Sequence, residues 1–195
     1  RADQHAGSTR VVSAIVFGQP LGPQALGLLQ LQDDPQYPRI PASRRVALVE
    51  AALEDGRLWA DLAGERWGRD PAAIAARCKV PVVQSEDDAG FGSVIVYAEL
   101  DCMIARRGVR KLLGTSETRP IFIAHELYHH FDCKGDSPPL SRRHPVRIFG
   151  LGSWNWMSGL LSLSEIAAGA FAQRLLGLAF HPKLLDCLVT ENRQS

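Results

Sequence analysis

The chain has 195 residues, of which 46% are hydrophobic and 22% are charged. A chain of this length buries a substantial core and fits one domain, or one domain with an appendage. Its 22 Lys and Arg residues nearly balance its 21 Asp and Glu residues, so bulk charge indicates neither a nucleic-acid partner nor an acidic membrane surface. The four cysteines are widely spaced, and no secretory signal is visible at the start of the sequence. We therefore expect free thiols and a cytoplasmic protein.

The first 40 residues carry most of the turn signals, with prolines and glycines in "FGQPLGPQ" and "QDDPQYPRIP". They are predicted to form an extended arm with one short strand at 11–17, and residues 41–195 are predicted to form the main domain. The segment 43–68 spaces its apolar residues at helical intervals, which predicts an amphipathic helix. Asp70, followed by a proline at the first helical position, predicts that another helix begins there.

The rest of the chain is predicted to supply a small sheet and the helices that back it. The predicted elements are strands at 80–84, 91–100 and 102–106, a short helix at 109–114, and helices after Pro120 and over 160–178 and 182–190. The apolar stretch 148–180 is not predicted to cross a membrane, because Glu165 would lie at the centre of the span. The expected fold class is α+β, a small sheet backed by helices, with the segment 121–132 on a central helix.

That segment, "IFIAHELYHHFD", contains the pattern H-E-x-x-H. On a helix, His125 and His129 lie on the same face, so both imidazoles can bind one zinc ion. Glu126 is then placed beside a zinc-bound water, whose proton it can accept as a general base. Unpaired histidines and a glutamate would be costly among the surrounding apolar residues, which favours a zinc site over a merely polar helical face.

A catalytic zinc needs a third protein ligand and an open fourth position. Asp132, Asp136 and His144 lie near the two histidines in sequence and are candidates. Glu165 is the favoured third ligand, because a lone carboxylate within an apolar segment is tolerated if it binds a cation.

Other polar and aromatic side chains are given lesser roles. His130 is expected to point to another face of the helix, and Trp154 and Trp156 are expected to pack in the core. Tyr128 and His144 are weaker candidates for stabilising the oxyanion of a tetrahedral intermediate.

The two motifs together resemble those of the ImmA/IrrE-like zinc metallopeptidases, which are gluzincin-type enzymes. That family combines H-E-x-x-H with a later helix of the form E-x-x-A-(D/N)-x-F-A-x-x-L-L-M-P, and residues 165–178 of this chain read "EIAAGAFAQRLLGL". The resemblance covers roughly residues 45–180. It implies a zincin-like fold, Zn²⁺ held by His125, His129 and Glu165, and a catalytic glutamate inside the H-E-x-x-H pattern.

Three departures separate this chain from the family pattern. Gly169 stands where the family has Asp or Asn, a residue that orients a ligand histidine in gluzincins, and a Gly-Leu pair replaces the final Met-Pro. His129 and Glu165 are 36 positions apart, and the insertion at 133–156 is expected to form a loop near the cleft. Another group must therefore orient His125. The local choices are Asp132, Asp136 and a backbone carbonyl.

The resemblance implies a metallopeptidase that hydrolyses a protein or peptide substrate, for example a transcriptional regulator. Neither direct nucleic-acid binding nor a membrane partner is expected. The main alternative is a non-enzymatic regulatory module that keeps the metal site and binds a peptide, and a weaker one is a zinc hydrolase of a non-peptide amide. Gly169 favours the binding module, whereas the intact Glu126 favours the enzyme.

Overall fold

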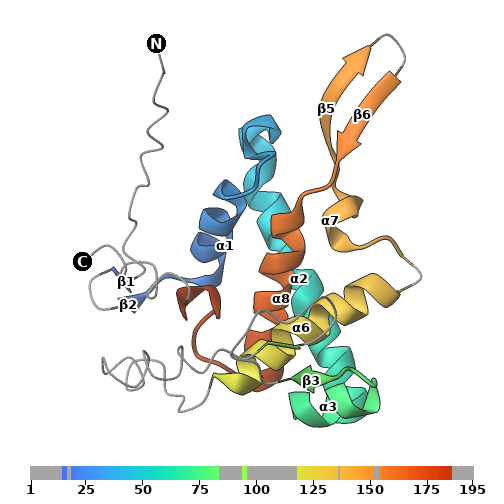
Figure 1. Ribbon diagram of the computed structural model, residues 1–195. Helices are drawn as coiled ribbons and strands as arrows, with labels where there is room; N and C mark the ends of the chain where they lie inside the picture. Colours follow the sequence, from blue (N-terminus) through green and yellow to red (C-terminus); the bar gives the residue numbers. More distant parts are fainter. Residues whose placement is uncertain are drawn as a thin grey trace, which may run out of the picture.

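The computed structural model describes residues 15–16, 19–83, 94–95, 118–135, 137–151 and 154–185 (Figure 1). These residues are mostly helical and include short paired strands, so the α+β class is confirmed at a coarse level. Across the described residues, no helix combines the length and the apolar character needed to cross a membrane. Two of the expected free thiols, Cys78 and Cys133, are free, and the other two cysteines lie outside the described residues.

The core is built on the longest helix, α2 (Ala42–Trp67), against which α8 (Leu161–Leu176) packs. Helix α6 (Arg119–Lys134) packs on α8 in turn (Figure 1). Most side chains of α8 are buried, as expected for a helix enclosed by others. Gly56 permits a close approach of α2 and α8, because a Cβ built on it would overlap the carbonyl oxygen of Ala167 and lie 2.9 Å from the carbonyl carbon.

Two helices predicted from local signals are confirmed near their predicted bounds. The predicted helix at 43–68 corresponds to α2, and the one that follows Asp70 is α3 (Pro71–Arg77). The Asp70 carboxylate accepts a hydrogen bond of 2.9 Å from the backbone N–H of Ala72, which is the expected N-cap contact.

The extended arm predicted for residues 1–40 is wrong for its second half. This part forms helix α1 (Pro23–Gln32) and a 3₁₀ turn, η1 (Tyr37–Arg39), and it contributes to the core. The prolines mark the starts of these elements, where a missing N–H costs nothing, and not extended chain. The buried residues of this part are Leu26, Gly27, Leu31, Asp34 and Ile40.

Three short strands, β1 (Ile15–Val16), β3 (Val82–Val83) and β4 (Val94–Ile95), fall inside predicted ones, whereas β2 (Gln19–Pro20) was not predicted. β3 pairs in parallel with β4. β1 pairs antiparallel with β2. The strand predicted at 102–106 and the short helix predicted at 109–114 lie outside the described residues.

The insertion between the two motifs forms a short helix and a hairpin instead of the predicted loop. Helix α7 (Leu140–Arg143) precedes β5 (Val146–Leu151) and β6 (Trp154–Ser158), which pair antiparallel and project away from the helices (Figure 1). The predicted core packing of Trp154 and Trp156 is wrong, because these side chains are 83% and 73% exposed. Strand alternation puts both on one open face of the hairpin.

Candidate metal centre

Helix α6 presents the H-E-x-x-H pattern at the edge where it meets α8. His125 and His129 lie one turn apart, and their side chains are 25% and 26% exposed. The opposite side of the helix is apolar and anchors it in the core, so the two imidazoles are turned toward solvent at this edge. The residues that α6 buries are Ile121, Ile123, Ala124, Leu127, Tyr128, Phe131 and Asp132.

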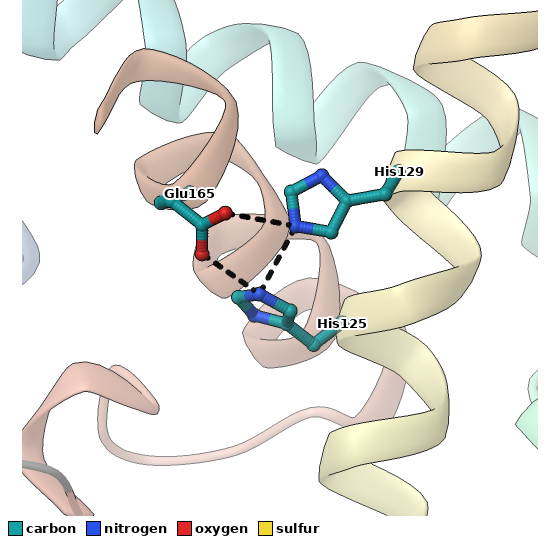
Figure 2. Close-up of side chains that lie close together, drawn as sticks. All are labelled: His125, His129 and Glu165. Atoms are coloured by element: carbon teal, nitrogen blue, oxygen red, sulfur yellow. Dashed lines mark hydrogen bonds and ion pairs between the residues drawn. The ribbon is translucent and has the colours of Figure 1, made fainter. Parts of the chain in front are cut away.

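Glu165 reaches the same edge from α8, as Figure 2 shows. Its Oε2 lies 3.1 Å from Nε2 of His125, and its Oε1 lies 3.3 Å from Nε2 of His129. The two Nε2 atoms are 3.2 Å apart. Among the described residues, these three form the only group of His, Cys, Asp or Glu side chains that could hold a metal ion. The structure thus brings together the three ligands predicted from the sequence.

The spacing of these side chains suits a tetrahedral metal ion such as zinc. In a tetrahedral site with nitrogen and oxygen ligands at about 2.0–2.1 Å, neighbouring ligand atoms are about 3.3 Å apart. The two Nε2 atoms are 3.2 Å apart, close to that value, and they lie 3.1 and 3.3 Å from different oxygens of the Glu165 carboxylate. Two imidazoles and one carboxylate form a donor set found in catalytic zinc sites, which keep a fourth position open. The Glu165 side chain is 47% exposed, so solvent reaches the cluster.

The expected burial of Glu165, which favoured it as the third ligand, is only partly confirmed. A buried charge was expected, yet Glu165 is half exposed while its neighbours Ser164 and Ile166 are buried. Its carboxylate therefore lies at the solvent-facing edge of α8, and the energetic cost of its burial is smaller than the apolar sequence around it indicated. Its position opposite two histidines is the stronger reason for assigning it to the site.

Glu165 and His129 alter each other's protonation. Burial lowers the pKa of His129, but the hydrogen bond and charge of Glu165 outweigh it and raise this pKa above its ordinary value. Burial raises the pKa of Glu165, but hydrogen bonds with His125 and His129 outweigh it and hold this pKa well below its usual range. The low pKa keeps Glu165 ionised, which is the form of a carboxylate that binds a cation.

Glu126 lies beside the cluster and is not part of it. It follows His125 on α6 and is exposed to solvent. Its negative charge helps to raise the pKa of His129, so its carboxylate is close enough to act on that ring. A carboxylate near the ligands but outside the ligand set is what a general base at this position requires.

Asp132 has a structural role behind the histidines and is neither a ligand nor the partner of His125. Its buried carboxylate accepts hydrogen bonds from the backbone N–H of Leu140 at 2.8 Å, the hydroxyl of Ser164 at 2.9 Å and the guanidinium of Arg143 at 3.3 Å. These bonds connect α6 to α7 and α8, so they fix the helix of the histidines relative to the helix of the glutamate.

A second set of bonds connects this network to α2. Arg143 also donates to Asp55 at 2.6 Å, and the hydroxyl of Tyr128 donates to the other Asp55 oxygen at 2.7 Å. Tyr128 is fully buried, and this burial, together with the Asp55 carboxylate, raises its pKa. A buried hydroxyl already bonded to Asp55 is not positioned to stabilise a substrate oxyanion. The weaker prediction for Tyr128 is therefore wrong.

The remaining sequence candidates fall outside the cluster. His144 ends α7 and is not among the grouped ligands. His130 faces the ring of Phe131 edge-on, with 5.8 Å between the ring centroids, and burial lowers its pKa. Asp136 lies outside the described residues. No group that orients His125 through its Nδ1 is found among the described residues.

Gly169 makes room for the ring of His181, which was not among the residues proposed for the site from the sequence. A Cβ built on Gly169 would overlap Cε1 of His181 and lie 2.7 Å from its Nε2. The His181 ring is 1% exposed, its Nδ1 accepts the backbone N–H of Lys183 at 3.3 Å, and its Nε2 has no hydrogen-bond partner among the described residues. Burial lowers the pKa of His181 to about 4, so the ring is neutral. In the sequence, Gly169 is the residue that could have indicated this packing, because a glycine inside a packed helix leaves volume for another group to fill.

No model of a known protein family, no characterised protein sequence and no solved structure matches this chain. The resemblance to the ImmA/IrrE-like metallopeptidases therefore stays a prediction that rests on the two motifs.

Proposed function

We propose that the protein is a zinc-dependent metallopeptidase with a zincin-like fold, which hydrolyses peptide bonds in a protein or peptide substrate. The three-residue cluster carries this proposal, because His125, His129 and Glu165 can each offer one ligand atom, all within 4.8 Å of one another, at a solvent-accessible edge. Two histidines from one helix and a glutamate from a second are also the ligand arrangement implied by the resemblance to gluzincin-type enzymes.

The residues of the site divide the work of hydrolysis between them. His125 and His129 would hold zinc through Nε2, and Glu165 would complete the protein ligand set with a negative charge. When bound, zinc supplies Lewis acidity, which polarises a carbonyl group and makes water easier to deprotonate. Glu126 accepts the proton of the attacking water and delivers it to the nitrogen of the leaving amine.

One observation favours a second function, a non-enzymatic module that keeps the metal and binds a partner peptide. The ring of His181 occupies the place of a side chain at Gly169, so no carboxylate or amide from that position can orient a ligand histidine. Loss of such an orienting group typically reduces metal affinity or activity about 10- to 100-fold. Glu126 distinguishes the two functions, because a binding module does not need a proton acceptor beside its metal.

The test combines metal analysis with a single conservative substitution. We expect the purified, zinc-reconstituted protein to hold one zinc ion and to cleave a mixed library of fluorogenic peptides. Glu126→Gln should keep the zinc but reduce cleavage by about 100-fold or more, because an amide does not accept the proton. Glu65→Gln, which alters an exposed glutamate on α2, is the matched control and should cleave normally.

The outcomes separate the two proposals. Stoichiometric zinc with no cleavage of any peptide would favour the binding module. Unchanged cleavage by Glu126→Gln would remove this residue from the mechanism, and failure to bind zinc would remove both functions.

A further inference from the structure

The β5–β6 hairpin exposes three aromatic side chains on one face. Phe149, Trp154 and Trp156 are 62%, 83% and 73% exposed. Phe149 pairs directly with Trp156 across the strands, and Trp154 is two residues from Trp156 along the same strand, so all three share a face. Contiguous exposed apolar surface of this kind marks an interaction site.

The opposite face of the hairpin carries Arg147 and Asn155 beside the exposed Met157, and a β-bulge places Arg147 there. The strand register shifts between Arg147 and Phe149, so these residues face opposite sides although they are two positions apart. Arg147 pairs with Met157, and Gly150 pairs with Asn155, on the second face. The Arg147 guanidinium lies against Gly150, because a Cβ built there would be 2.6 Å from the Arg147 Nε. Arg147 makes no ion pair among the described residues.

The charged side chains of the hairpin and its base have a single sign. Residues 137–164 include Arg142, Arg143 and Arg147 but no Asp or Glu. Arg143 forms ion pairs with Asp55 and Asp132 in the helical body. Arg142 and Arg147 are exposed. The hairpin and its base therefore combine an aromatic surface with net positive charge.

The aromatic face is too small for a stable dimer of this chain. Aromatic side chains bury about 150–250 Å² each when fully covered, so the exposed parts of Phe149, Trp154 and Trp156 offer roughly 400 Å². A standard protein–protein interface takes about 800 Å² from each partner. An aromatic face backed by arginine on the other side instead matches an element that lies in a membrane interface, where Trp is enriched and basic residues attract anionic headgroups.

We propose that the β5–β6 hairpin docks the protein peripherally on bilayers that contain anionic lipids. Phe149, Trp154 and Trp156 enter the interfacial region, while Arg142 and Arg147 stay at the level of the headgroups. The hairpin projects beyond the helical body, so it can reach a bilayer without rearrangement of the metal centre (Figure 1). Both the aromatic face and the positive charge are needed, because either contribution alone gives only marginal membrane binding.

Vesicle flotation of the full chain tests this docking. We expect flotation with vesicles of phosphatidylcholine and phosphatidylglycerol, weaker flotation with phosphatidylcholine alone, and loss of binding as salt is raised. The double variant Trp154→Ser/Trp156→Ser should bind anionic vesicles at least about tenfold more weakly and should lose the vesicle-induced blue shift of tryptophan emission. Arg147→Gln should weaken binding about fivefold, and only on the anionic vesicles.

The matched control removes exposed apolar side chains elsewhere. Leu58 and Leu62 on α2 are 56% and 49% exposed, and Leu58→Ser/Leu62→Ser should float as the wild type does. Circular dichroism of each variant checks that the helices are intact, and Arg147→Gln with the salt series tests docking even if the tryptophan variant does not fold.

Three results would overturn the inference. They are no flotation of the wild-type chain, equal flotation of the wild type and the tryptophan variant, and a hairpin-dependent dimer in analytical ultracentrifugation without vesicle binding. The last result would assign the aromatic face to a second copy of the chain.

Discussion

Replacement of Gly56 with alanine is expected to destabilise the fold and to weaken the metal site together. Inside an exposed helix this change is favourable by about 1 kcal/mol. At Gly56, however, the new Cβ would overlap the carbonyl oxygen of Ala167 and lie 2.9 Å from its carbonyl carbon and 3.0 Å from the Cβ of Ala170. Ordinary contact begins at 3.4 Å, so α2 and α8 must separate by at least 0.5 Å. Backbone atoms cannot rotate away as a side chain can.

The size of the effect follows from two opposing contributions. Overpacking costs about 1–3 kcal/mol, and overlap with backbone atoms places Gly56→Ala at the upper end of that range, at about 2–3 kcal/mol. Helix propensity offsets about 1 kcal/mol of that cost, which leaves a net destabilisation of about 1–2 kcal/mol. In a chain of this size, the unfolding midpoint should fall by about 2–8 °C. Ala167 is two residues from Glu165 on α8, so the same displacement changes the position of the Glu165 carboxylate relative to the histidines, and zinc affinity should fall about tenfold.

Gly64→Ala supplies a matched control on the same helix. A Cβ built on Gly64 would meet no atom closer than 3.8 Å, so alanine should raise stability by up to about 1 kcal/mol there and leave zinc binding unchanged. Urea unfolding followed by circular dichroism gives the stability, and competition with a chromophoric chelator gives the zinc affinity. If Gly56→Ala is as stable as Gly64→Ala, the close approach of α2 and α8 does not constrain the fold as inferred.

Further substitutions test the hydrogen-bond network of Asp132 and the predicted ligand set. Asp132→Asn keeps the side-chain shape but replaces one of the two acceptor oxygens with an NH₂ group and removes the negative charge that faces Arg143, so it should cost about 2–4 kcal/mol in urea unfolding. Asp61→Asn makes the same change in the exposed pair of Asp61 with Arg174 and should leave the midpoint within error, so equal effects would contradict the role of Asp132. His129→Ala and Glu165→Ala should each lose stoichiometric zinc in metal analysis, while His130→Ala should keep it, and retention of zinc by either of the first two would place the ion elsewhere.

Elements that depend on local signals were predicted well from the sequence. α2 follows from its apolar periodicity, and α3 follows from the Asp70 cap and the proline after it, because both signals act within one or two helical turns. α1 was not predicted, because Pro20 and Pro23 near its start indicate extended chain. Its apolar residues are also spread around the helix axis, so the sequence shows no clear polar face. Its helical structure depends on packing against α2 and α8.

The hairpin could not be predicted, because its strands depend on each other. The run from Ile148 to Met157 is apolar and lies just before α8, so it resembles the start of a long buried helix. Strand pairing between Phe149 and Trp156 is a non-local contact, and a short apolar run does not distinguish a strand from a helix by periodicity alone.

The ligand set was predicted for reasons of unequal strength. His125 and His129 follow from helical spacing alone, which is local. Glu165 is brought to them by packing of α8 on α6, and the sequence pointed to it through an expected burial that the structure shows to be partial. The role of Asp132 could not be predicted from the sequence. Two of its three hydrogen-bond donors come from α7, and a helix of four residues is too short to show an apolar periodicity.

Gly169 illustrates why comparison with a family pattern predicts metal ligands more reliably than it predicts the residues that orient those ligands. Read by position alone, glycine in place of Asp or Asn is the loss of an orienting group. In the fold, the absence of a side chain at Gly169 leaves a space. The ring of His181, from the segment after α8, fills that space. Burial lowers the pKa of that ring to about 4 and keeps it neutral, so it fills the space without the negative charge that a carboxylate would bring. The predicted metal ligands must meet one another at one point, which constrains their positions, whereas a group that orients a ligand histidine only has to reach the second nitrogen of that ring and can come from another segment.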